Sequence, residues 1–98
     1  MYQFESDPSH GWLGVPLNEL IELGIHNDIS VYSYYDARRS LVWLEEDCDA
    51  SRFIIAKAGT TDRETIGKWL GLNTIERHTN NLSRIRNLPS FDISGVSA

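Results

Sequence analysis

The segment that most constrains the fold is residues 16–24, PLNELIELG, because these nine residues contain a complete helix signal. Pro16 suits the first helical position, where the missing N–H costs no hydrogen bond. Gly24 suits the left-handed conformation that commonly ends a helix. Apolar side chains three and four positions apart share one face of such a helix, and they are Leu17, Leu20 and Ile21. We therefore expect a helix over residues 16–23 that buries one face against other elements.

Strand patterns lie on both sides of this helix. Residues 2–4 and 12–15 are short apolar segments separated by the turn sequence SDPSHG, in which Asp, Pro and Gly favour a tight turn. Residues 29–35 alternate in the manner of a strand, and residues 41–44 form an apolar run after a polar turn. This second pair predicts a β-hairpin with a loop of about four residues.

The second half of the chain predicts two helices and an edge strand. Residues 50–58 read as a helix ended by Gly59, with Asp47 and Asp49 as carboxylate caps at its N-terminus. Thr61 to Glu64 has the sequence of a capping box, which indicates a helix that ends at Gly71. Residues 73–79 alternate weakly and predict an edge strand.

This order of elements predicts an α+β fold, with an antiparallel sheet and two to three helices packed on one face. Its 98 residues suffice for one domain, residues 1–98, with a single core. We expect the last few residues to be mobile, because the chain ends in small residues.

Composition excludes several classes of protein. No apolar run approaches the roughly 20 residues that span a bilayer, and the first residues, MYQFE, lack a signal peptide's basic and apolar regions. A single cysteine cannot form an internal disulfide. We expect a soluble protein of the reducing cytoplasm, with no membrane contact.

Charge is divided unequally along the chain. Residues 1–49 carry ten acidic residues against two arginines, a net charge of −8, whereas residues 50–98 carry seven basic residues against four acidic ones, a net charge of +3. The whole chain has a net charge of −5 and no basic field, which makes duplex nucleic acid an unfavourable partner.

One alternative for residues 64–77 is a helix-turn-helix with its turn at Gly71 and a recognition-like helix from Thr74. The apolar residue expected about six positions after the turn glycine is Arg77 instead. The sequence therefore favours the strand and leaves the helix open.

Metal and catalytic motifs are weak. His10, Cys48 and His78 are the strongest soft-metal ligands, but no two lie at the close spacing of a structural zinc site. Cys48 is expected to be a small buried apolar residue without reactivity. We expect no metal and no cofactor, and no nucleophile–base pair supports an enzyme.

Polar and aromatic residues without an obvious structural role are the candidates for binding. They are His10, Trp12, Tyr34, Glu45, Glu46, His78, Arg84 and Arg86. The favoured interpretation is a non-enzymatic module that acts on a host protein through an acidic, aromatic surface. Its aromatic part is expected to include some of Trp12, Tyr32, Tyr34 and Tyr35. The alternative is a small hydrolase or an anionic-ligand-binding protein that uses a cleft of histidine, arginine and carboxylate groups.

Long-range charge pairing gives a further prediction. The strand over residues 41–44 must place either Glu45 or Glu46 on a covered face, where an unpaired carboxylate is costly. The C-terminal segment SRIRN, residues 83–87, is therefore predicted to fold back over the hairpin and to pair an arginine with Glu45 or Glu46.

Five segments together resemble a family of small bacterial and phage proteins without an assigned function. They are HGWLGVPLNEL, LGI, ISVYSYYD, VWLEEDCDA and ERHTNNLSRIRN, and the similarity covers most of the chain. The resemblance implies a compact standalone protein carried by a phage or another mobile element. It implies no catalytic residues. The oligomeric state is left open.

Overall fold

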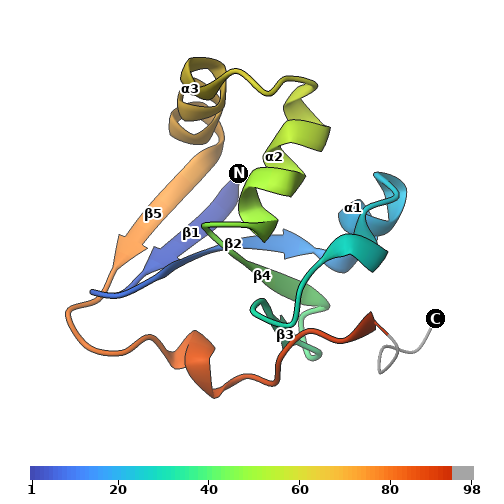
Figure 1. The fold of residues 1–98 in the computed structure, drawn as a ribbon. Helices are drawn as coiled ribbons and strands as arrows, with labels where there is room; N and C mark the ends of the chain where they lie inside the picture. Colours follow the sequence, from blue (N-terminus) through green and yellow to red (C-terminus); the bar gives the residue numbers. More distant parts are fainter. Residues whose placement is uncertain (94–98) are drawn as a thin grey trace.

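The computed structural model describes residues 1–93, and the predicted mobility of the last few residues concerns positions outside this range. The chain has an α+β fold in which one sheet is combined with helices (Figure 1). The strands are β1 (Tyr2–Ser6), β2 (Gly11–Pro16), β3 (Tyr34–Asp36), β4 (Leu41–Glu45) and β5 (Thr74–His78). The α-helices are α1 (Leu17–Glu22), α2 (Asp49–Ala58) and α3 (Arg63–Asn73), and single 3-10 turns occur at His26–Asp28 and Arg84–Asn87.

The five strands lie in the order β3-β4-β2-β1-β5. All neighbouring pairs are antiparallel except β1 and β5, which are parallel. The predicted antiparallel sheet is thus correct for four strands, and the predicted edge strand is present at one margin. Because the strand over residues 74–78 follows α3 directly, no second helix of a helix-turn-helix exists there.

One face of the sheet carries the main core. Alternate residues of β2 and β4 point to this face, where they pack against α1 and α2, as period two requires of strands. The fully buried Phe53 of α2 lies at its centre, edge-on to Tyr2 and to Trp69 of α3. The other buried members are Leu13, Val15, Leu17, Leu20, Val42, Leu44, Ala50, Ile54 and Phe91.

The opposite face of the sheet, called the second face below, is covered by the C-terminal segment, residues 79–93 (Figure 1). Trp12 of β2 and Trp43 of β4 pack there against Ile85. Gly14 makes room for Trp43, since a Cβ at Gly14 would lie 2.9 Å from the indole ring. The segment thus closes a second, smaller apolar cluster.

The end of the C-terminal segment passes around the β3 edge. The Tyr35 N–H donates to the Pro89 carbonyl, and the Phe91 N–H donates to the Ser33 carbonyl. Phe91 is buried in the main core and contacts Tyr35 edge-on. One segment therefore joins both apolar clusters and covers the outer edge of β3.

The helix predicted over residues 16–23 is present as α1, but Pro16 ends β2 and precedes the helix instead of taking its first position. Gly24 has φ +72°, and the N–H groups of Gly24 and Ile25 donate to the carbonyls of Ile21 and Leu20. This arrangement is the Schellman motif. Gly59 ends α2 in the same left-handed conformation, with φ +71°, as its position predicted.

The strand predicted over residues 29–35 is shorter than expected, because β3 begins only at Tyr34. Ser30 begins a turn in which the Ser33 N–H donates to its carbonyl. Their hydroxyls, and the Ser30 N–H, donate to the buried carboxylate of Asp49. Local side-chain hydrogen bonds of this kind compete with strand pairing.

The predicted caps of two helices require correction. Asp49 begins α2, but its carboxylate binds the Ser30–Ser33 turn, and α2 has no side-chain cap. Asp47 is exposed and lies outside the helix. At α3 the cap is Asp62, which accepts hydrogen bonds from the N–H and hydroxyl of Thr65. It lies one position after Thr61, the capping residue predicted from the sequence.

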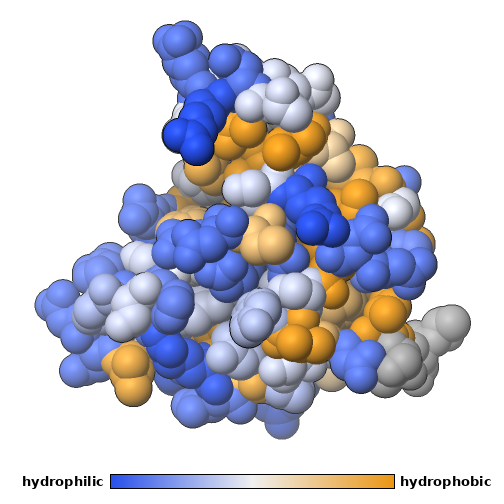
Figure 2. Space-filling view, in the orientation of Figure 1, coloured by the Kyte–Doolittle hydropathy of each residue, from blue (hydrophilic) through white to orange (hydrophobic). Residues whose placement is uncertain are grey.

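Surface hydropathy is mixed on the face that Figure 2 shows. Hydrophobic side chains gather over the helical half of the molecule in this view, but hydrophilic side chains interrupt them. Within residues 1–93, no helix is both long enough and apolar enough to cross a membrane.

Candidate functional site

The candidate site lies on the second face, where β2 begins and β4 ends. Trp12 pairs with Glu45 in the antiparallel register, and the Glu46 N–H donates to the Gly11 carbonyl. Because alternate residues of a strand share a face, Glu45 lies on the side of Trp12 and Trp43. Glu46 belongs to the helix side, at an exposed position beyond the core.

A surface depression of about 500 Å³ lies at this corner. Several predicted binding residues line it together, and they are His10, Trp12, Tyr34, Glu45 and Arg86. Val31, Tyr32 and Ser90 complete the wall. The depression is called the aromatic pocket below, and it brings together residues from four separate parts of the sequence.

Aromatic rings form much of the pocket. Tyr34 lies edge-on to Trp12 with ring centroids 6.1 Å apart, and the His10 ring lies 6.2 Å from that of Trp12. Tyr32 and Val31 are 73% and 62% exposed. Exposed apolar side chains beside packed aromatic rings are typical of sites that bind another molecule.

Arg86 is held in the pocket wall by Asp7. Its Nε donates to Oδ2 at 2.6 Å and a terminal nitrogen donates to Oδ1 at 3.1 Å, so the pair is bidentate. The guanidinium carbon also lies 5.2 Å from the centroid of the Trp12 ring, within the range of a cation–π interaction. Both interactions fix the C-terminal segment against the sheet.

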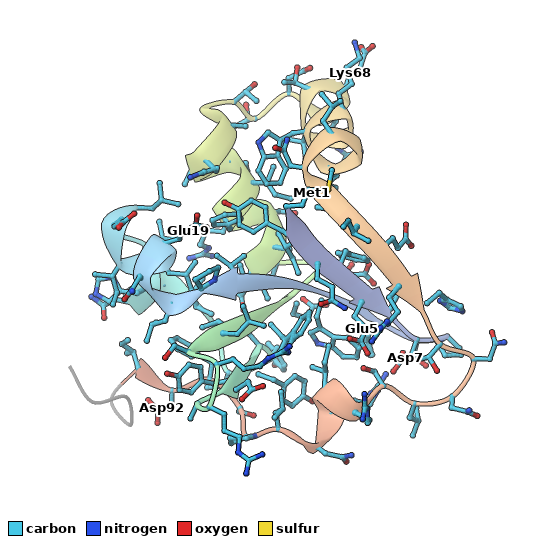
Figure 3. The ribbon with its side chains drawn as sticks, turned by 180° about the vertical axis from the view of Figure 1, so that it is seen from behind. Met1, Glu5, Asp7, Glu19, Lys68 and Asp92 are labelled. Carbon is cyan, nitrogen blue, oxygen red and sulfur yellow. The ribbon has the colours of Figure 1, made fainter. Side chains whose placement is uncertain are left out.

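Asp7 is the hub of this contact. Its side chain is fully buried in the turn after β1, and its carboxylate also accepts hydrogen bonds from the N–H groups of Ser9, His10 and Ser83. Figure 3 shows Glu5 and Asp7 at the end of β1, beside the C-terminal segment. The Arg86 guanidinium and these N–H groups hold the pKa of Asp7 well below its usual range.

The predicted fold-back of residues 83–87 is confirmed, but its predicted partner is wrong. Within residues 1–93, neither Arg84 nor Arg86 forms an ion pair with Glu45 or Glu46. The buried carboxylate is Asp7 instead. Asp7 already accepts hydrogen bonds from N–H groups of its own turn. The sequence around it therefore does not indicate that its partner is Arg86, almost eighty positions away.

The charge that remains at the pocket is acidic. Arg86 is matched by Asp7, whereas no cation of the described chain forms an ion pair with Glu45, Glu46 or Asp47. Partial burial, with repulsion from Asp47 and Glu45, raises the pKa of Glu46. The corner therefore attracts a cation more readily than an anion.

Glu45 is positioned by a buried hydrogen-bond network. The Ser33 hydroxyl donates to Asp49 and accepts from the backbone N–H of Glu45. Asp49 and Ser33 are both fully buried. The carboxylate predicted as a helix cap thus fixes the strand end that carries Glu45.

The remaining predicted residues lie elsewhere. His78 is exposed at the end of β5, where its Nδ1 lies 2.9 Å from the Ser6 hydroxyl. Arg84 lies beside it, and both line a smaller depression of about 320 Å³. The two histidines and two arginines of the predicted polar cleft are therefore divided between two places.

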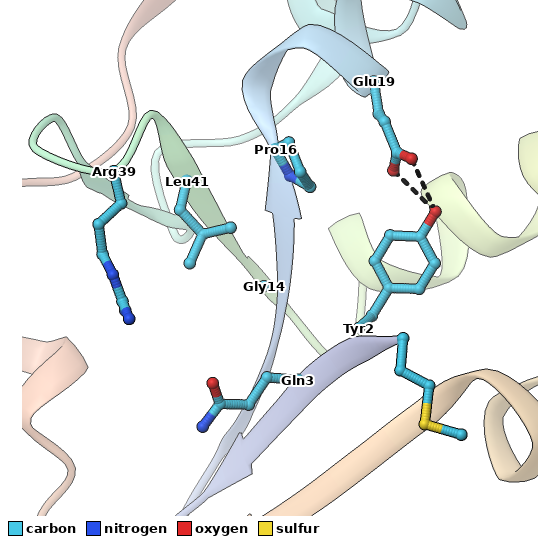
Figure 4. A pocket seen from close by; sticks show the side chains of 8 residues that line it. Tyr2, Gln3, Gly14, Pro16, Glu19, Arg39 and Leu41 are labelled. Carbon is cyan, nitrogen blue, oxygen red and sulfur yellow. Dashed lines mark hydrogen bonds between the residues drawn. The ribbon is translucent and has the colours of Figure 1, made fainter.

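Another depression of about 500 Å³ lies at the start of β1 (Figure 4). There the Tyr2 hydroxyl donates to both Glu19 oxygens, at 2.8 and 2.9 Å, and Lys57 lies 3.9 Å from the same carboxylate. Burial and Glu19 raise the pKa of Tyr2 to about 12. These polar groups tie β1 to α1 and α2, and no residue predicted from the sequence lines this depression.

Sequence reasoning missed two residues of the aromatic pocket, which are Val31 and Ser90. Val31 and Tyr32 were placed within a strand, and the Ser30–Ser33 turn brings them to the rim instead. Cys48, which was predicted to be buried, is exposed.

Comparison with family models, with curated proteins and with solved structures finds no match. The resemblance in the five sequence segments stays a prediction.

Proposed function

We propose that the chain is a non-enzymatic protein-interaction module that binds a protein partner through the aromatic pocket and its acidic rim. The observation that carries this proposal is the convergence of His10, Trp12, Tyr34, Glu45 and Arg86 on one depression. The resemblance to phage and bacterial proteins makes a host protein of the cytoplasm the proposed partner.

The pocket has the composition of a protein-binding surface. Trp12 and Tyr34 supply rigid aromatic surface, and Tyr32 and Val31 stand exposed beside them. Tyrosine, tryptophan and arginine are enriched where interfaces bind most tightly. The rim carries Glu45, with Glu46 and Asp47 adjacent in sequence. The proposed partner therefore offers an apolar segment with a basic side chain.

The alternative of a hydrolase or an anionic-ligand-binding protein has weaker support. Arg86 is engaged by Asp7, and His78 and Arg84 lie at a different depression from His10. Because Asp7 matches the charge of Arg86, the described residues that line the pocket offer an anion little attraction.

Capture of a partner from a bacterial lysate tests the proposal. Wild-type protein and a Tyr32→Ala variant are each immobilised, and the retained proteins are identified and then titrated individually. We expect one partner whose affinity falls at least tenfold in the variant, because loss of an exposed aromatic anchor commonly costs more than about 1.4 kcal/mol of binding free energy.

A Leu72→Ala variant is the matched control. Leu72 is 75% exposed on α3, so it removes an apolar side chain of similar exposure outside the pocket. Partners retained equally by wild type and Tyr32→Ala but lost in Leu72→Ala would place the binding surface on α3 and contradict the proposal.

A further inference from the structure

Three potential metal ligands meet at the margin of the aromatic pocket. A nitrogen of His10 and a carboxylate oxygen each of Glu45 and Asp47 all lie within 4.8 Å of one another. The two carboxylates are two positions apart in the sequence, whereas His10 is distant from both of them. The expectation of no metal rested on linear spacing, which this arrangement does not require.

The strand register explains why these side chains meet. Trp12 pairs with Glu45, and the next contact along the ladder joins the Glu46 N–H to the Gly11 carbonyl. His10 directly precedes β2, and Asp47 lies in the turn that follows β4, so both flank this pair. Glu45 projects on the side of Trp12 and Trp43, because residues two apart on a strand share a face, and the short distances among the three groups bring His10 and Asp47 to the same edge.

We propose that His10, Glu45 and Asp47 bind a divalent transition-metal ion of the zinc type. This inference goes beyond the proposed function, because it requires no protein partner. The three groups supply one imidazole nitrogen and two carboxylate oxygens, and they leave coordination positions open for water or for a ligand of a partner.

The donor set selects the class of ion. Imidazole suits zinc, copper, nickel and iron, whereas calcium and magnesium prefer sites made of oxygen alone. Hydrogen bonds hold the backbone at His10, Glu45 and Asp47, so only the ligand side chains need to be ordered when the ion binds. A cation also relieves the repulsion between Glu45 and Asp47, which no ion pair of the described residues offsets.

The ligands have supporting hydrogen bonds of the kind that tune metal sites. The Asp47 N–H donates to Glu45 Oε2 at 3.1 Å, and the Glu45 N–H donates to the buried Ser33 hydroxyl at 3.0 Å. The second contact belongs to the Asp49 network, which lies outside the ligand cluster. It fixes the backbone of Glu45 independently of any ion.

Calorimetric titration of the full, tag-free chain with zinc chloride tests the proposal. We expect one ion per chain, with affinity reduced at least tenfold in His10→Ala and in Glu45→Gln. His10 is exposed and Glu45 only partly buried, so both variants are expected to fold, and circular dichroism checks this. His78→Ala is the matched control, since that histidine is also exposed but lies on β5, and its affinity should equal that of wild type.

Manganese supplies a second measurement that locates the site. Its paramagnetism should broaden the amide resonances around His10 and Glu45 first in a nuclear magnetic resonance titration. Absence of zinc binding, equal affinity of His10→Ala and wild type, or broadening centred on His78 would each overturn the proposal.

Discussion

The two faces of the sheet are covered in different ways. The helix face is closed by three helices over one cluster of aliphatic and aromatic side chains, centred on the fully buried Phe53. The second face is closed by a single segment, whose Ile85 packs on Trp12 and Trp43. An ion pair between the fully buried Asp7 and the partly exposed Arg86 takes the place there of a broad apolar contact.

This difference bears on where a site can form. A helix layer satisfies its own backbone hydrogen bonds and seals the sheet, whereas a single segment leaves the margins of the second face open. The aromatic pocket lies at one such margin, between Arg86 and the end of β4. Loops placed on a rigid scaffold commonly carry function for this reason.

The largest predicted effect comes from removing the covering of the second face. Truncation after Leu82 deletes Ile85 and Phe91, and buried residues of these types contribute about 2 and about 3 kcal/mol or more to stability. That sum is comparable with the whole stability of a small domain, about 5–15 kcal/mol. We expect the truncated chain to lack a cooperative thermal transition, measured by circular dichroism.

A chain that ends at Ile93 is the control for this truncation, because it keeps the described contacts of the C-terminal segment. An unchanged melting temperature in the shorter chain would show that the C-terminal segment is not needed to stabilise the second face.

The ion pair gives the next largest effect. Removing one partner of a buried pair leaves the other charge unmatched, so Asp7→Ala should lower the free energy of unfolding by about 3 kcal/mol at pH 7. Because Arg86 is partly exposed, water limits the loss. Urea denaturation measures it, and Glu64→Gln is the control, since Glu64 forms only an exposed pair with Lys68.

The same pair predicts a pH dependence. The pKa of Asp7 is lower in the folded protein than in the unfolded chain. The carboxylate therefore makes its full contribution to the free energy of unfolding above the unfolded pKa of about 3.9, and this contribution is lost as pH falls toward the folded pKa. Wild type should lose stability steeply between about pH 4 and pH 2. Asp7→Asn lacks this titration, and parallel curves for the two proteins would contradict the assignment.

A smaller effect is predicted at Asp49, where two interpretations give different results. A helix cap would tolerate Asn. The observed carboxylate instead accepts hydrogen bonds from Ser30 and Ser33 in a fully buried position. Asp49→Ala should therefore cost about 2 kcal/mol, and Asp49→Asn at least about 1 kcal/mol, because the amide offers one acceptor oxygen instead of two. If Asp49→Asn is as stable as wild type in urea denaturation, the helix-cap interpretation is correct instead.

The features that were predicted correctly from the sequence are those that depend on neighbouring residues in the chain. The end of α1 at Gly24 and the alternation over residues 74–78 follow from conformational preference and period, and both are present. Period two also required that Val42 and Trp43 face opposite sides, as they do.

The remaining features depend on partners distant in the chain. Asp7 satisfies its own turn, so nothing near it in the sequence indicates Arg86. Ser30 and Ser33 lie in a segment whose alternation predicts a strand. They form a turn instead, because both donate hydrogen bonds to Asp49, which is distant in the sequence. The pocket and the ligand cluster both depend on these contacts, which explains why their residues were identified individually but not assembled.

The smallest predicted effect separates binding from stability on the second face. Tyr32 and Tyr35 are close in sequence, but Tyr32 is 73% exposed at the pocket rim, whereas Tyr35 packs edge-on against the buried Phe91. Tyr32→Ala should change the free energy of unfolding by less than about 0.5 kcal/mol, because it removes few contacts. Tyr35→Ala should cost about 2 kcal/mol, less than a fully buried aromatic residue. Urea denaturation of both variants measures the difference. Equal losses would mean that the Ser30–Ser33 turn folds Tyr32 into the core, and the rim would then have no exposed anchor to offer a partner.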